Sequence, residues 1–303
     1  MRCLLVLFRI PFLCSATLLL SARCAWADSV LNLKQGETVV LLGDTFFERD
    51  YNHGSLETAL TVATAGKQIR FRNLGWSGDT PRGESRSYFG PPSEGFARLK
   101  DQLKEIKPTT VIACYGAVDS FQGDAGAESF VSAYRNLIKM VRETTGATVV
   151  LLSPPATGSD HARWPSLNDH EVALDKYSQL IATLAADEKL AFADLHGLMR
   201  GQQWITVNGI TFTPEDYVKI APLLVKCLGL TSGKSIADSP RLRSLILSKN
   251  RLFFERWRPQ NEIYLFGSRK HEQGRNGAEI PQFDPLIAEM EKQIADAVSG
   301  SAK

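Results

Sequence analysis

Short apolar runs alternate with longer stretches of helical periodicity along most of the chain. The runs are rich in β-branched residues and end at turn residues, which is typical of buried strands. They lie at 38–43, 69–75, 109–116, 148–155 and 190–198. Between them the spacing of apolar residues predicts helices at 55–65, 95–106, 127–145, 168–188 and from Thr213 onward. This alternation predicts βαβ crossovers and one parallel sheet covered by helices on both faces.

The helix that begins near Thr213 carries a clear start signal. Thr213 can be the N-cap, Pro214 occupies the first helical position, and Asp216 lies where the acid of a capping box would lie. The segment just before it, Asn208 to Thr211, reads Asn-Gly-Ile-Thr.

The first 27 residues have the pattern of a signal peptide. Arg2 and Arg9 precede an apolar run, and an A-x-A cleavage site ends at Ala27. The alternative, a membrane anchor, is weaker because the run is short and is broken by Pro11. We therefore predict cleavage, export to the periplasm or the exterior, and no stable membrane insertion.

Charge and cysteine content exclude several classes of function. Without the three arginines of the leader, the chain keeps 32 of its 35 basic side chains against 33 acidic ones, so nothing favours nucleic acid as a partner. Cys114 and Cys227 are the cysteines that remain after cleavage, and they are expected to be buried thiols. The sequence has no metal-ligand spacing and no phosphate-binding loop, so we expect no metal and no cofactor.

The chain divides into a main domain at 28–232 and an extension at 233–303. The extension starts and ends as an amphipathic helix, with an irregular polar stretch between them. It is too small and irregular for an independent fold, so we expect it to pack on the main domain. An activity or partner contact of its own stays open, although no motif supports one.

The turns after the first three predicted strands carry polar side chains. They read "GDT" (43–45), "NLGWSGDT" (73–80) and "YGAVDSF" (115–121). Ligands of open parallel sheets bind at the carboxyl ends of the strands. The turns are therefore expected to form one crevice, with Asp44, Asp79 and Asp119 in it.

These turns, in this order, resemble those of the SGNH or GDSL hydrolase family. That family has a Gly-Asp-Ser turn, a glycine loop, a Gly-x-Asn-Asp turn and a late Asp-x-x-His. The extension, with "KNRLFFERWRPQN" and "KHEQG", resembles that of a bacterial exported subgroup. The resemblance implies a three-layer αβα fold with a five-stranded parallel sheet in flavodoxin-like order 2-1-3-4-5 and a C-terminal helical appendage. It also implies ester hydrolase ancestry, with a small-molecule, glycan or lipid ester as ligand.

The family's functional positions are altered in this sequence. Thr45 stands at the nucleophile position, and Gly75 matches the glycine whose backbone N–H helps form the oxyanion hole. Val118 replaces the asparagine donor, Asn208 the aspartate and Thr211 the histidine. Thr45 is either a nucleophile or a residue that closes its own turn, and Gly75 has a turn role as its alternative. Asp119 is expected to be a local cap.

The altered positions predict weak or absent family-type catalysis. In serine hydrolases, loss of one oxyanion donor costs about 10²–10³ in rate, and loss of the base alone about 10⁶. The alternative is an active esterase that uses Thr45 with a relocated base, for which His271 and His53 are the candidates. His161 and His170 are expected in a solvated loop, and His196 is expected to be structural.

Overall fold

The computed structural model describes residues 30–88, 90–158, 167–231, 239–272 and 274–300. The predicted signal peptide, the predicted boundary between 232 and 233, and His161 lie outside the described residues.

A five-stranded parallel sheet forms the centre of the main domain, with the order β2-β1-β3-β4-β5. The strands are β1 Thr38–Gly43, β2 Arg70–Gly75, β3 Thr110–Cys114, β4 Thr148–Leu152 and β5 Ala191–Ala193. Gly43 pairs in register with Gly75 on one side and with Cys114 on the other. The carboxyl ends of these three strands are therefore level, and the predicted fold class and strand order are confirmed.

Alternating side chains of the strands fill two separate cores. Val39 and Leu41 of β1 belong to one apolar cluster, whereas Val40 and Leu42 belong to the other. Successive residues of a strand point to opposite faces, so a strand buried on both faces needs an unbroken apolar run. This is why "TVVLLG" does not alternate with polar residues.

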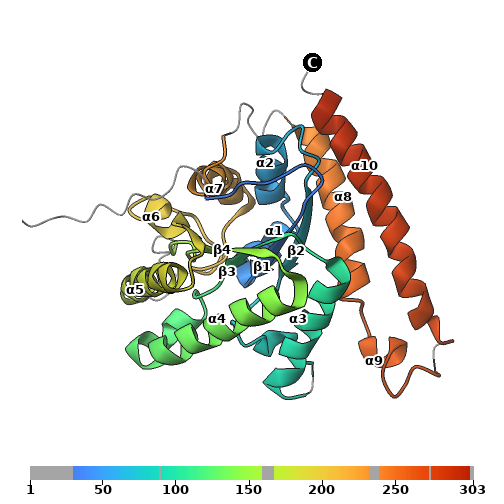
Figure 1. The fold of residues 1–303 in the computed structure, drawn as a ribbon, viewed down its shortest axis with the longest axis horizontal. Helices are drawn as coiled ribbons and strands as arrows, with labels where there is room; N and C mark the ends of the chain where they lie inside the picture. Colours follow the sequence, from blue (N-terminus) through green and yellow to red (C-terminus); the bar gives the residue numbers. More distant parts are fainter. Residues whose placement is uncertain (1–29, 89, 159–166, 232–238, 273, 301–303) are drawn as a thin grey trace, which may run out of the picture.

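Helices cover both faces of the sheet (Figure 1). One core contains residues of α1 Thr45–Asp50, α2 Ser55–Ala63, α6 Leu195–Met199 and α7 Pro214–Cys227. The other contains residues of α3 Pro92–Ile106, α4 Gly123–Thr145 and α5 Asn168–Asp187. The sequence did not predict α1 or α6, and α6 occupies the end of the run expected to be strand at 190–198.

The start of α7 follows the predicted cap with one difference. Thr213 is the N-cap, its hydroxyl oxygen accepts the Asp216 N–H at 3.3 Å, and Pro214 is at the first position. The Asp216 carboxylate does not return to the cap. It accepts the Ile205 N–H instead and pairs with Lys219 at 2.8 Å.

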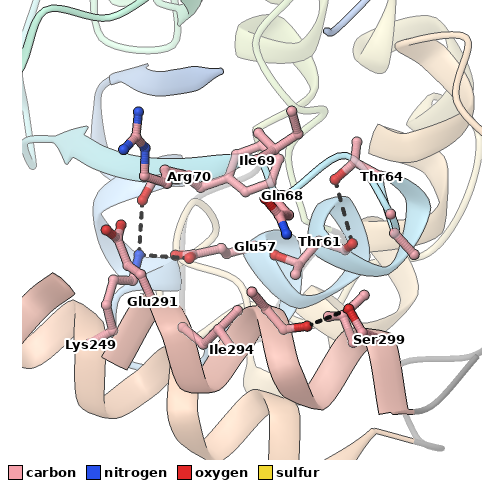
Figure 2. A pocket seen from close by; sticks show the side chains of 15 residues that line it. Glu57, Thr61, Thr64, Gln68, Ile69, Arg70, Lys249, Glu291, Ile294 and Ser299 are labelled. Carbon is pink, nitrogen blue, oxygen red and sulfur yellow. Dashed lines mark hydrogen bonds and ion pairs between the residues drawn. The ribbon is translucent and has the colours of Figure 1, made fainter. Parts of the chain in front are cut away.

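The C-terminal extension packs along one side of the main domain (Figure 1). It consists of α8 Pro240–Trp257, α9 Glu262–Leu265, the 3-10 helix η4 Asn276–Gln282 and α10 Phe283–Gly300. The long helices α8 and α10 lie side by side, and α8 also contacts α2 and β2. Lys249 of α8 forms a buried ion pair with Glu57 of α2 at 2.6 Å (Figure 2). None of the helices in the described part of the chain is both long and apolar enough to cross a membrane.

Candidate active site

Thr45 is the first residue of α1, immediately after the carboxyl end of β1. Asp44 caps this helix, because its Oδ1 accepts the Phe46 N–H at 3.1 Å. Thr45 is half-buried, and its Oγ1 accepts the backbone N–H of Gly78 at 3.1 Å. The hydroxyl at the nucleophile position is therefore held beside a backbone donor from the turn after β2.

The glycine that contacts Thr45 is Gly78, which the sequence did not single out, and the oxyanion role of Gly75 stays a prediction. The Gly75 N–H is used by the Asn73 side chain, whose Oδ1 accepts it at 2.9 Å. A Cβ on Gly75 would lie 2.3 Å from the backbone nitrogen of Glu48, so this glycine allows α1 to pack against β2. Gly78 has a φ of +72°, which glycine adopts without strain and which suits the turn that aims its N–H at Thr45.

The turn after β3 carries Val118 at the position where the sequence analysis noted the loss of a side-chain donor. Val118 is half-buried and offers only an apolar side chain at this position. Asp119 is buried, and Arg82 pairs with it at 3.0 Å. Asp119 was expected to be a local cap, whereas its carboxylate pairs with this guanidinium from the loop after β2.

The segment that carries Asn208 and Thr211 lies beside α1. The ring of Phe212 meets the ring of Phe46 edge-on, with centroids 6.3 Å apart. The Tyr217 hydroxyl donates to the Phe46 carbonyl at 2.8 Å. Because Phe46 follows Thr45 and Phe212 follows Thr211, these contacts bring the positions expected for nucleophile and base to the same edge of the sheet.

Neither residue of this loop can act as the family's dyad does. Asn208 Oδ1 accepts the N–H groups of Ile210 and Thr211 at 3.2 and 2.7 Å, so its amide oxygen closes its own turn. The hydroxyl of Thr211 cannot take up a proton near neutral pH.

The three carboxylates of these turns, Asp44, Asp79 and Asp119, are all buried. Asp79 is neutralised by Arg86 at 2.7 Å and accepts the Tyr115 hydroxyl at 3.1 Å. Burial raises the pKa of Asp44 to about 7, and the charges of the other two carboxylates add to this rise. Burial also raises the pKa of Asp119 to about 6, against the lowering effect of Arg82.

The two predicted replacement bases lie outside the turn that carries Thr45, and their roles stay predictions. His53 follows the C-terminal end of α1, whereas Thr45 begins this six-residue helix. The His53 ring packs on the Tyr217 ring, with centroids 4.9 Å apart. His271 is exposed in the extension, between α9 and η4. His196 is a buried residue of α6, and its Nε2 lies 3.7 Å from carboxylate oxygens of Glu171 and Asp175.

His170 differs from its predicted place in a solvated loop. It is only 8% exposed, and its ring stacks on Phe121 with centroids 3.7 Å apart. Its Nε2 lies 2.8 Å from the hydroxyl oxygen of Ser120, in the turn after β3. No local pattern along the chain predicts this pair, because fifty positions separate the two residues.

Comparisons with known proteins agree with this architecture. The model of the GDSL-like lipase/acylhydrolase family matches residues 41–210. A catalytic mutant of Axe2, an acetylxylan esterase from Geobacillus stearothermophilus, superposes with a TM-score of 0.51 at 15% identity, covering 68% of this chain and 100% of its own. BT4096, a gut microbial diltiazem-metabolizing enzyme, has a TM-score of 0.57 at 11% identity, covering 90% and 98%. At these identities the structures show a shared fold. No curated protein sequence matches the chain.

Proposed function

We propose that the chain, which belongs to the GDSL-like lipase/acylhydrolase family, binds a small ester ligand in the crevice of that family. We expect little or no hydrolysis of the family's type. The observation that carries this proposal is the loop from Asn208 to Thr211. It is built and packed beside α1, yet it offers no base to Thr45. Acylated carbohydrates are the favoured ligand class, since Axe2 is an acetylxylan esterase, and lipid esters are the alternative.

The crevice keeps the features that binding requires. Gly78 donates its backbone N–H to the Thr45 hydroxyl oxygen. The carbonyl oxygen of a bound ester would accept this same N–H. Backbone donors and binding alone can leave a rate advantage of about 10³–10⁴ over water in serine hydrolases that have lost their triad. Residual hydrolysis of that size is compatible with a protein whose role is to bind.

A second candidate function is hydrolysis by Ser120 and His170. A hydroxyl and an imidazole within hydrogen-bond reach form the basic unit of nucleophilic ester cleavage. Burial lowers the pKa of His170, which keeps the ring neutral and able to take a proton. In this reaction Ser120 Oγ would bond to the ester carbon while Nε2 takes the serine proton and returns it to the departing alcohol. Water, activated by the same nitrogen, would then release the acid.

The surroundings of this pair favour a structural role over the second candidate. Ser120 is 1% exposed, and its hydroxyl also lies 2.9 Å from the Ala117 carbonyl, which can accept its proton in place of His170. The Nδ1 atom of His170 has no hydrogen-bond partner among the described residues, so no third group orients the ring. The exposed ring of Phe121 covers one face of the imidazole.

A fluorophosphonate probe distinguishes the candidates. We expect no labelling of Thr45 at pH 7, since the described residues offer its hydroxyl no base. Peptide mapping after labelling reads the result, with Thr45→Ala and Ser120→Ala as matched variants. Labelling confined to Thr45 would contradict the proposal, and labelling lost in Ser120→Ala would establish the second candidate.

A further inference from the structure

The turn after β2 contacts the C-terminal extension through Arg258, the residue that follows α8. Trp76 begins this turn and is only 8% exposed. The Arg258 guanidinium carbon lies 3.7 Å from the centroid of the Trp76 ring and 4.7 Å from that of Phe254 in α8. Such cation–π contacts are strongest where water is excluded. One side chain of the extension therefore packs on the first residue of the turn that carries Gly78.

A second series of contacts joins the same guanidinium to Gly78. Arg258 Nη1 lies 3.6 Å from Oε1 of Glu48 in α1. The other oxygen of this carboxylate, Oε2, accepts the Ser77 hydroxyl at 2.7 Å. Ser77 directly precedes Gly78, whose N–H donates to Thr45 at 3.1 Å. The contacts thus lead from the extension to the backbone donor of the candidate site.

The ends of the turn are held by backbone hydrogen bonds of the main domain. The Trp76 N–H donates to the Gly43 carbonyl at 2.9 Å, and the Asp79 N–H donates to the Trp76 carbonyl at 3.0 Å. The middle of the turn has less support. The only described atom within 4 Å of a Cβ built on Gly78 is the Ser85 hydroxyl oxygen, at 3.5 Å. The direction in which the Gly78 N–H points therefore depends on how the neighbouring serine is held.

Two arginines lie beside the Glu48 carboxylate. The Arg49 Nε atom is 3.4 Å from Oε2, but this side chain is 45% exposed, so water screens its charge. The Arg258 side chain is 22% exposed, and two aromatic rings set its position. We therefore expect Arg258, more than Arg49, to decide where the carboxylate lies.

We propose that Arg258 is a positioning residue for the candidate site. It holds the Glu48 carboxylate, and this carboxylate holds Ser77. The Gly78 N–H thereby stays directed at the place where an ester carbonyl oxygen binds. The extension thus takes part in the site of the main domain without contacting the ligand. The consequence for ester binding rests on the proposed function, whereas the contacts themselves involve no ligand.

The test is the hydrogen-exchange rate of the Gly78 amide, measured by NMR on the purified full chain. Arg258→Ala and Ser77→Ala should each raise this rate by about tenfold, because each removes one contact of the series. The double variant should exchange no faster than the faster single variant, since both changes act through the same carboxylate. Arg269→Ala removes an exposed ion pair elsewhere in the extension and should leave the rate unchanged.

The outcomes separate positioning from general stabilisation. A Gly78 rate within about twofold of wild type in both single variants would overturn the inference. Additive effects in the double variant would overturn it as well, because the two side chains would then act independently. The amide of Leu41, in the middle of β1, reports unfolding of the sheet. If its exchange accelerates as much as that of Gly78 in both single variants, Arg258 only stabilises the fold and the inference fails.

Calorimetric titration with xylose tetraacetate, a fully acetylated sugar, tests the consequence separately. We expect Arg258→Ala to weaken this binding by about fivefold, the effect of losing one hydrogen bond, and Arg269→Ala to bind like the wild type. Equal binding by wild type and Arg258→Ala would overturn the role of Arg258 in the site. If the wild type does not bind the ester, the proposed function fails, and the exchange rates alone decide whether Arg258 positions Gly78.

Discussion

Replacement of Lys249 by alanine is expected to lower the free energy of unfolding by about 3–5 kcal/mol, because it leaves a buried carboxylate without its counter-ion. The Lys249 ammonium donates to Glu57 at 2.6 Å and to the Phe71 carbonyl at 2.9 Å (Figure 2). Both charged side chains are almost fully buried. The pair joins the extension to the main domain, so its loss should weaken the packing of α8 as well. Urea denaturation measures the change.

Two controls make this prediction specific. Lys104→Ala removes an exposed ion pair with Asp101 and should cost less than about 1 kcal/mol. The double variant Lys249→Met with Glu57→Leu removes both charges and should recover most of the loss, since apolar groups of similar volume often replace a buried pair without cost. A loss below about 1 kcal/mol in Lys249→Ala would mean that the pair does not hold the extension in place.

The Asp44→Asn variant is expected to change how stability depends on pH. Burial raises the pKa of Asp44 from 3.8 to about 7 in the folded protein. Between these values the folded chain keeps a proton that the unfolded chain has lost, so stability falls as pH rises from about 4 to about 7. For one such group the fall is on the order of 4 kcal/mol. Asparagine cannot ionise, yet its side-chain oxygen can still cap α1.

Unfolding free energies at pH 5 and pH 8 test this directly. The wild-type protein should be less stable at pH 8, and Asp44→Asn should remove several kcal/mol of the difference. Asp101→Asn, at an exposed position, should leave the difference unchanged. An identical pH dependence in wild type and Asp44→Asn would show that Asp44 titrates normally.

The sheet and most helices could be predicted because their signals are local. Burial on both faces demands the unbroken apolar run of β1, and the cap at Thr213 lies within a few residues of the helix that it starts. Helix α1 was missed because its six residues follow the strand directly and are too few to show a helical period.

The site was only partly predictable, because its contacts are made between distant segments. The segment 73–80 contains two glycines, Gly75 and Gly78, and the resemblance singled out only Gly75. The N–H that reaches Thr45 depends on where β2 ends. Strand β2 ends at Gly75, and Gly78 lies in the turn that follows it. The Ser120–His170 pair arises from packing of separate elements, which no spacing along the chain encodes.

The most direct test of the proposed function is hydrolysis of p-nitrophenyl acetate by the wild-type protein and by Thr45→Ala. A variant with Val118→Asn, Asn208→Asp and Thr211→His shows whether the crevice accepts this substrate once donor and base are returned. The altered site predicts that wild type and Thr45→Ala hydrolyse the ester at the same rate, within about twofold, because Thr45 has no base to activate it. A wild-type rate more than about tenfold above that of Thr45→Ala would contradict this account and identify Thr45 as a working nucleophile.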